Sequence, residues 1–197
     1  MSTGHALQLG IFVFDGAEEL DVVGPFEVLA RWAEHSELRP RVVTFSTEGA
    51  AVRCAKGLRL VPDHAAADVG ALHVLVHPGG PGIRALAADS DHLAWVRAMA
   101  DSTHLMASVC TGALVFAAAG LLGGRPVATH WSASGELAAI DGSVVADTQA
   151  RFVDDGDVVT SAGGSAGIDM ALHLVARLES PEAALQVRRD MQYGDGA

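Results

Sequence analysis

A cysteine at an expected strand-to-helix junction is the residue of this chain best suited to nucleophilic chemistry. Cys110 lies in SVCTGALVFAAAG (108–120), directly after the apolar run LMASV (105–109). Gly112 allows a sharp turn that presents the sulfur at a helix N-terminus, as in a nucleophile elbow. Helix N–H groups and the helix dipole favour the thiolate, which is the attacking form. The alternative is a structural cysteine, since free cysteines often pack as small apolar residues.

Two further segments bring polar groups to strand ends. HPGGPG (77–82) ends an apolar run. Its glycines let the N–H groups of Gly79 and Gly80 approach a developing negative charge, which predicts an oxyanion hole, although a plain turn explains them equally well. FDGAEELD (14–21) supplies a carboxylate cluster in which Asp21 enters an apolar helix. The ordinary role of such a residue is a solvated N-cap.

Histidine placement raises two questions. His77 precedes Pro78 where an aliphatic residue is expected, and a strand end beside the elbow would bring its imidazole near the sulfur. His73 shares a strand face with His77 by even spacing, but no third ligand is apparent, so no metal site is predicted. Cys54 is interpreted as structural.

The elements that must position these residues alternate between short apolar runs and Ala-rich segments. Strands are predicted over 7–14, 41–47, 72–78, 105–109 and 127–130, with a short excursion over 58–64. Helices are predicted over 21–35 (interrupted early by Gly24-Pro25), 89–101, 111–120, 132–139, 166–178 and 181–192. A hairpin is predicted over 143–162, because Asp155-Gly156 suits a tight turn. The alternation predicts an α/β fold with a mostly parallel sheet and helices on both faces. Ligands in such folds gather at the carboxyl ends of the strands, where Cys110 falls.

Composition narrows the class of protein. The chain has 197 residues, half of them hydrophobic, with a net charge of -11 and only two cysteines. One domain over 1–197 is expected, without a disulfide framework. The acidic balance disfavours nucleic-acid binding, which depends on clustered Lys and Arg. The N-terminal apolar run has no preceding basic segment and is too short to span a bilayer, so a cytoplasmic protein without membrane association is expected.

Four segments together resemble the ThiJ/PfpI superfamily, within the class I glutamine amidotransferase-like fold, over most of the chain. They are GAEELDVVGPFEVL (16–29), HPGG (77–80), SVCTGALVFAAAGLLGGRPVATHW (108–131) and AGGSAGID (162–169). The resemblance implies a flavodoxin-like or Rossmann-like three-layer sandwich and commonly a homodimer. It places the superfamily's nucleophilic cysteine on Cys110 and its acidic residue on Asp21. LDxxGP, Cys-Thr-Gly and Thr-His-Trp most resemble isonitrile hydratases, whose relatives also form the N-terminal domains of AraC-type regulators.

The resemblance implies a role for each residue near the sulfur. Like-charge repulsion between Asp21 and the thiolate leads us to expect the proton on Asp21, with coupled titration. Thr111 stands where protease-like relatives have a histidine, so no Cys-His pair forms there and peptidase activity is not expected. Thr111 either offers its N–H and hydroxyl to a substrate or caps the helix. His130 resembles a histidine that often approaches the site in relatives, although a lone histidine is more often a hydrogen-bonded surface or core residue.

The leading hypothesis is an isonitrile hydratase-like lyase without a cofactor, acting on a small, mostly apolar organic substrate. Cys110 would attack the isonitrile carbon to give a thioimidate, and Asp21 would supply and recover protons. The amides of Gly79, Gly80 and Thr111 would stabilise charge. One alternative is a glyoxalase-type or deglycase-type enzyme acting on reactive carbonyls. Another is a ligand or redox sensor domain: a regulator of the AraC type would carry a helix-turn-helix region downstream, for which no segment here is long or basic enough, whereas a stand-alone sensor with an oxidisable Cys110 stays an alternative.

Overall fold

The centre of the molecule is a seven-stranded sheet. The computed structural model describes residues 7–194; residues 1–6, on which the inference about a leader partly rests, lie outside the described residues. The sheet contains β1 (Gln8–Phe12), β2 (Arg41–Ser46), β5 (His64–Ala65), β6 (Val74–His77), β7 (Leu105–Val109), β10 (Phe152–Asp154) and β11 (Val158–Ser161). Their order is β10-β11-β7-β6-β1-β2-β5, and every neighbouring pair is parallel except β10 and β11. The predicted mostly parallel sheet is confirmed.

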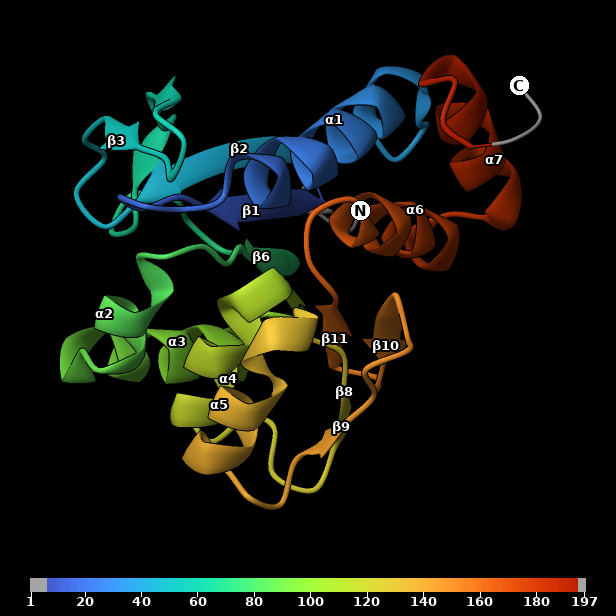
Figure 1. Ribbon diagram of the computed structural model, residues 1–197. Helices are drawn as coiled ribbons and strands as arrows, with labels where there is room; N and C mark the ends of the chain where they lie inside the picture. The colour runs from blue at the N-terminus through green and yellow to red at the C-terminus, as the bar shows by residue number, and fades with distance from the viewer. Residues whose placement is uncertain (1–6, 195–197) are drawn as a thin grey trace.

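Helices cover both faces of this sheet, as predicted. They are α1 (Glu19–His35), α2 (Ile83–Ala87), α3 (Ser90–Ser102), α4 (Ala113–Ala118), α5 (Ser134–Ile140), α6 (Ala166–Leu178) and α7 (Pro181–Asp190). Figure 1 shows α1, α6 and α7 together on one side of the sheet and α2 to α5 on the other. Since strands covered on both faces need apolar side chains throughout, the central strands β6 and β7 are buried along their whole length.

The predicted interruption of the first helix is wrong. α1 continues through Gly24 and Pro25, both of which are buried. Pro25 cannot donate to the carbonyl of Asp21, but the helix continues with that bond missing, since both residues are packed in the interior. A Cβ on Gly24 would lie 3.1 Å from Cγ1 of Ile168, so the missing side chain lets α1 and α6 approach closely.

Several shorter segments also differ from the prediction. Of the strand expected over 127–130, only Val127 belongs to a strand: β8 (Pro126–Val127) pairs with β9 (Val145–Ala146), outside the main sheet. The hairpin is confirmed for β10 and β11 only, closing around Gly156 (φ 84°) with a 2.9 Å bond from Asp155 N to Val158 O. The excursion at 58–64 becomes β4 (Arg59–Leu60), paired with β3 (Val52–Arg53), and then β5. The five-residue helix α2 was not predicted, because it is too short to show a period.

Gly167 on α6 tests the close packing of this layer. A Cβ there would lie 2.9 Å from Cγ1 of Val109 and 3.4 Å from Cγ of Pro25. We expect Gly167→Ala to lower the free energy of unfolding by about 1–3 kcal/mol in urea titrations, because overpacking strains the core.

Gly135 on α5 is the matched control, since a Cβ there meets nothing within 4 Å. Gly135→Ala should be neutral or raise the free energy of unfolding by up to about 1 kcal/mol, because alanine favours the helix. Equal effects of the two substitutions would contradict the close approach of α6 to β7.

Candidate active site

Cys110 occupies a strained turn between β7 and α4. Its φ is 60°, in the left-handed region that a residue with a Cβ rarely adopts, and it begins the 3-10 turn η1 (Cys110–Gly112). Such a conformation costs about 1–3 kcal/mol and persists only where neighbours enforce it. Here the N–H of Cys110 donates to Ala162 O at 3.3 Å, and the hydroxyl of Thr129 donates to Cys110 O at 2.8 Å. The geometry is that of the predicted elbow.

The turn also needs a glycine directly after Thr111. A Cβ on Gly112 would lie 2.4 Å from the carbonyl oxygen of His77. Any larger residue would push the elbow away from the end of β6. The Cys-Thr-Gly motif is therefore explained by contact between two neighbouring strand ends.

Asp21 meets the sulfur from the first turn of α1. It is fully buried, and Glu18 rather than Asp21 occupies the N-cap position, so the solvated N-cap interpretation is wrong. One carboxylate oxygen accepts from Gly79 N at 3.2 Å and the other from Gly164 N at 3.1 Å, and the side chain is also hydrogen-bonded to Cys110. Burial raises the pKa of Asp21 to about 6, although all three hydrogen bonds oppose that rise.

The thiol of Cys110 is held in its protonated form. Burial is the largest cause and the negative charge of Asp21 the next, and together they raise the pKa of Cys110 to about 12. Hydrogen bonds from the N–H and hydroxyl of Thr111 lower it without cancelling the rise. The expected lowering by the helix N-terminus is therefore outweighed, because the thiol is buried beside a carboxylate.

Asp21 and Cys110 consequently share a single proton at neutral pH. Asp21 ionises first, because its raised pKa of about 6 still lies well below the pKa of about 12 of Cys110, so at neutral pH the proton rests on the sulfur. This reverses the expectation of a protonated Asp21 beside a resting thiolate. The two groups still titrate as a coupled pair, as expected, and the Asp21 carboxylate can act as the base that accepts the thiol proton.

The N–H groups of Gly79 and Gly80 do not form an open oxyanion hole. That of Gly79 is used by Asp21, and that of Gly80 donates to Oγ1 of Thr111 at 2.9 Å. A Cβ on Gly79 would lie 2.5 Å from Thr111 N, and Gly80 has φ 127°. These glycines therefore position the groups around the sulfur instead of facing a ligand with unused donors.

His130 lies beside Cys110, at the start of the 3-10 turn η2 (Trp131–Ala133). A Cβ on Gly163 would be 2.5 Å from Cδ2 of His130 and 3.0 Å from Sγ of Cys110, so the ring and the sulfur flank the same glycine. Nδ1 of His130 accepts from the N–H of Ser132 at 3.3 Å and lies 2.7 Å from Oγ of Ser132, so Nε2 is the nitrogen that carries a ring proton.

His77 does not approach the sulfur as expected. It is fully buried, its Nδ1 lies 3.0 Å from Pro78 O and its Nε2 lies 3.1 Å from Nε2 of His92. His73 does not join it, since its ring stacks on that of His104 instead. Both nitrogens of His77 are engaged inside the core, where the aromatic side chains around them favour a neutral ring.

Three groups at the site were missed by the sequence analysis. Gly163 leaves room for the sulfur, Gly164 holds Asp21, and Thr129 holds the elbow. The glycines lie in AGGSAGID, whose place after a strand and before a helix was the available signal. Nothing in the spacing of Thr129 indicated its bond to a residue 19 positions earlier.

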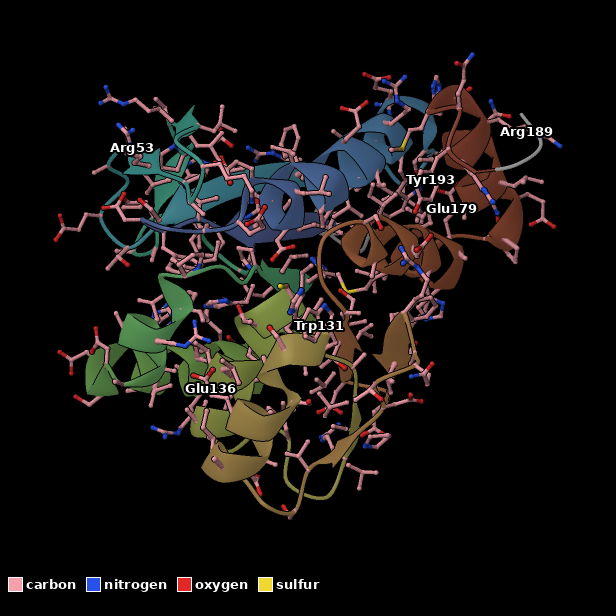
Figure 2. The ribbon with its side chains drawn as sticks, in the orientation of Figure 1. Arg53, Trp131, Glu136, Glu179, Arg189 and Tyr193 are labelled. Carbon is pink, nitrogen blue, oxygen red and sulfur yellow. The ribbon has the colours of Figure 1, made fainter. Side chains whose placement is uncertain are left out.

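A cleft of about 770 Å³ opens over Cys110, Thr111 and Gly80. Leu20, Pro81 and Trp131 give it apolar walls, and Trp131 is 75% exposed. Figure 2 shows Trp131 near the centre of the view, between the α1–α6 side of the molecule and the α4–α5 side. Charged groups at the cleft are paired: Arg84 with Glu136, Arg151 with Asp169 and Glu18 with Lys56.

Residues 7–194 contain neither a metal-ligand cluster nor a membrane-spanning helix. No group of three or more His, Cys, Asp or Glu side chains in that range is arranged to hold a metal ion. Within the same residues, no helix has the length and apolar character needed to cross a membrane.

The fold and site define an α/β protein with a cysteine at a strand-to-helix elbow beside a buried carboxyl group. The chain belongs to the DJ-1/PfpI family, whose model matches residues 8–177. A crystal structure of a ThiJ/PfpI family protein from Pseudomonas syringae is similar, with a TM-score of 0.87 and 30% identity, covering 98% of this chain and 77% of that one.

Named relatives fall into different functional classes. Isonitrile hydratase from Pseudomonas putida is 36% identical over 95% of this chain and 79% of that protein. The glutathione-independent glyoxalase DJR-1.2 from Caenorhabditis elegans is 31% identical over 85% of this chain and 86% of its own. The HTH-type transcriptional regulator GbdR from Pseudomonas aeruginosa is 32% identical over 76% of this chain, but only 40% of that regulator is matched. The family is established, and the activity requires a further argument.

The raised pKa of Asp21 predicts a specific pH dependence of stability. The folded state holds this proton more tightly than the unfolded state, because the pKa rises from 3.8 to about 6. The associated stabilisation is complete below the unfolded value and is lost as the pH rises through the folded value. Wild type should therefore gain about 2 kcal/mol in unfolding free energy relative to Asp21→Asn between pH 7.5 and 4.5.

Urea titrations of both proteins across that pH range measure the difference. Because the other titratable groups are common to the two proteins, their contributions largely cancel in the comparison. Parallel curves for wild type and Asp21→Asn would show that Asp21 titrates normally, contrary to its burial.

Proposed function

We propose that this protein is an isonitrile hydratase-like lyase that adds water to an organic isonitrile and releases an N-formamide. The observation that carries the proposal is the buried Asp21–Cys110 pair, which holds one proton and whose cysteine lines a partly apolar cleft. The 36% identity to isonitrile hydratase over 95% of the chain supports the choice of substrate class.

The first step uses the shared proton. The sulfur of Cys110 attacks the terminal isonitrile carbon while its proton passes to the Asp21 carboxylate. Asp21 then protonates that same carbon, so one C–S bond and one C–H bond form. The product is a thioimidate, S–CH=N–R, and Asp21 is again ionised. A thiol next to a carboxylate suits this addition, because neither a free thiolate nor an outside proton is required.

The second step consumes one water molecule. Water adds to the thioimidate carbon as its nitrogen gains a proton, giving a tetrahedral carbon that bears O, S and N. The C–S bond then breaks, the sulfur recovers a proton and the N-formamide leaves. The formamide contains all the atoms of one isonitrile molecule and one water molecule. Asp21 takes the first water proton and passes it to the nitrogen, then takes the proton of the resulting hydroxyl group and returns it to the sulfur as the C–S bond breaks.

The residues around the pair have supporting roles in this proposal. Thr111 hydrogen-bonds to the sulfur through its N–H and hydroxyl, which orients the attacking atom. His130 has its ring proton on Nε2, beside Gly163, where it would donate to the substrate nitrogen. Leu20 and Trp131 would receive an apolar substituent, because they form apolar walls of the cleft.

A glyoxalase-type reaction is the second candidate, favoured by the 31% identity to DJR-1.2 over 85% of the chain. The same thiol would add to an aldehyde carbon. Products separate the two activities, because methylglyoxal yields lactate whereas an isonitrile yields a formamide. A ligand or redox sensor domain is the remaining alternative, and rapid peroxide oxidation of Cys110 without turnover of either substrate would favour it.

The proposal is tested by turnover of cyclohexyl isonitrile in H₂¹⁸O, with formamide identified by mass. Wild type should form formamide carrying one ¹⁸O atom. Cys110→Ala should lose at least about a thousandfold in rate, because the covalent step is removed. Cys54→Ala is the matched control and should retain activity, since Cys54 is a buried cysteine that does not line the cleft.

Two results would contradict the proposal. One is formamide production by Cys110→Ala at the wild-type rate. The other is a folded wild-type protein that forms no formamide but converts methylglyoxal to lactate.

A further inference from the structure

An unusual buried histidine lies behind the site, on the core side of β6. His77 is fully buried at the end of that strand, its ring centre 5.1 Å from that of Phe12 and 6.0 Å from that of Phe116. Burial lowers the pKa of His77 to about 3, so the ring is neutral. An imidazole among aromatic side chains needs partners for both nitrogens, because an unsatisfied buried polar atom is costly.

The partners of His77 determine which nitrogen carries the proton. Nδ1 lies 3.0 Å from Pro78 O, and a carbonyl oxygen only accepts, so the proton is on Nδ1. In a neutral ring Nε2 is then an acceptor, so the N–H at Nε2 of His92 donates a hydrogen bond to it at 3.1 Å. Burial lowers the pKa of His92 to about 4, so His92 is neutral too. The hydrogen bonds therefore run in one direction, from His92 through His77 to Pro78 O.

That carbonyl belongs to the same peptide group as the N–H that holds Asp21. Pro78 O accepts from His77 on one side, and Gly79 N donates to Oδ2 of Asp21 at 3.2 Å on the other. A hydrogen bond on the oxygen of a peptide polarises it and makes its N–H a stronger donor. The chain of bonds thus ends on the carboxylate beside Cys110.

The peptide is also fixed in orientation by close contacts. A Cβ on Gly112 would lie 3.0 Å from Pro78 O, and a Cβ on Gly79 would lie 2.5 Å from Thr111 N. The elbow therefore packs directly on this peptide. The peptide therefore has little room to rotate. Loss of the hydrogen bond to its oxygen weakens its N–H as a donor to Asp21 without turning that N–H away.

We propose that His77 is a positioning residue that acts on Asp21 through the Pro78–Gly79 peptide. It keeps the carboxylate ionised and aimed at the sulfur, so that Asp21 accepts the Cys110 proton during attack. His92 supports this role by fixing the tautomer of His77. The inference rests on the proposed use of Asp21 as proton acceptor, but it concerns the reactivity of the thiol with any electrophile.

Other ionisable groups that face the pair are separate from this path. Glu18 raises the pKa of Asp21, and Lys56, paired with Glu18, interacts electrostatically with Asp21. On the far side, Asp89 faces His92 and opposes the fall in its pKa. His130 lies on the cleft side of the sulfur, beside Gly163. All of these groups remain in place when His77 alone is changed.

The test follows the rate of Cys110 alkylation by iodoacetamide against pH, in a Cys54→Ala background. Below the pKa of Asp21 both members of the pair are protonated and alkylation is slow; above it, Asp21 accepts the thiol proton. The acid limb, meaning the rise of the alkylation rate as the pH increases from acid values, therefore reports the ionisation of Asp21. His77→Phe removes both hydrogen bonds but keeps an aromatic ring. It should move the midpoint of the limb up by about half a pH unit, because the carboxylate loses part of its stabilisation.

His77→Asn is the rescue variant, because its side-chain N–H₂ stands near the position of Nδ1 and still donates to Pro78 O. It should return the midpoint most of the way to the parent value. Phe116→Leu is the packing control, since it disturbs a ring beside His77 without touching the hydrogen bonds. It should leave the midpoint unchanged. If His77→Phe does not fold, His92→Phe takes its place and should shift the limb in the same direction by less.

An unchanged midpoint in folded His77→Phe would overturn the proposal, as would an equal shift in Phe116→Leu. No isonitrile is used in this experiment. A protein that fails to hydrate isonitriles but shows the shift and its rescue by His77→Asn would keep the role of His77 and lose only the proposed substrate.

Discussion

The site depends on one constraint: two acids, Asp21 and Cys110, are buried in hydrogen-bonding contact with each other. Neither ionises easily there, because burial disfavours both charged forms and the charges would repel. Over a wide range of pH the pair therefore holds one proton. Because the pKa of Asp21 lies below that of Cys110, that proton is on the sulfur at neutral pH, and the thiol reacts only as its neighbour accepts the proton. Asp21 therefore supplies both the base and the acid for an addition reaction that requires proton transfer.

The sheet order explains how distant segments meet at this pair. Strands β1, β6, β7 and β11 lead into the segments that carry Asp21, Gly79, Cys110 and Gly164. In the sheet β1 neighbours β6, β6 neighbours β7, and β7 neighbours β11, all in parallel. Their carboxyl ends therefore share one edge, so that Asp21 bonds to a residue 143 positions later. The strained elbow and the tightly packed Gly79, Gly112 and Gly163 are local consequences of fitting these ends together.

Parts of this arrangement follow from the sequence because they depend on local pattern. β7 and α6 have the predicted bounds, since an uninterrupted apolar run and a clear helical period define them. Asp21, Cys110 and Thr111 come together as the resemblance implied. The helix through Pro25 was mispredicted, because tertiary packing with α6 overrides a local break.

What the sequence could not reveal is how donors are shared between segments. The N–H groups of Gly79 and Gly80 are available in the isolated motif, and only the fold shows that Asp21 and Thr111 use them. His77 stood out as an unexpected residue, but its orientation depends on His92, on a helix that no motif linked to the site. The resting position of the proton likewise depends on burial, which residue types alone do not define.

The central claim is that the resting pair is a thiol beside a carboxylate. The most direct test is a titration of Cys110 labelled with ¹³C at Cβ, followed by NMR from pH 5 to 10 in wild type and Asp21→Asn. The account predicts a thiol Cβ shift throughout, with a small step near pH 6 that disappears in Asp21→Asn, because that step reports the neighbouring carboxylate. A Cβ shift typical of a thiolate at pH 7 in the wild type would contradict it and place the proton on Asp21.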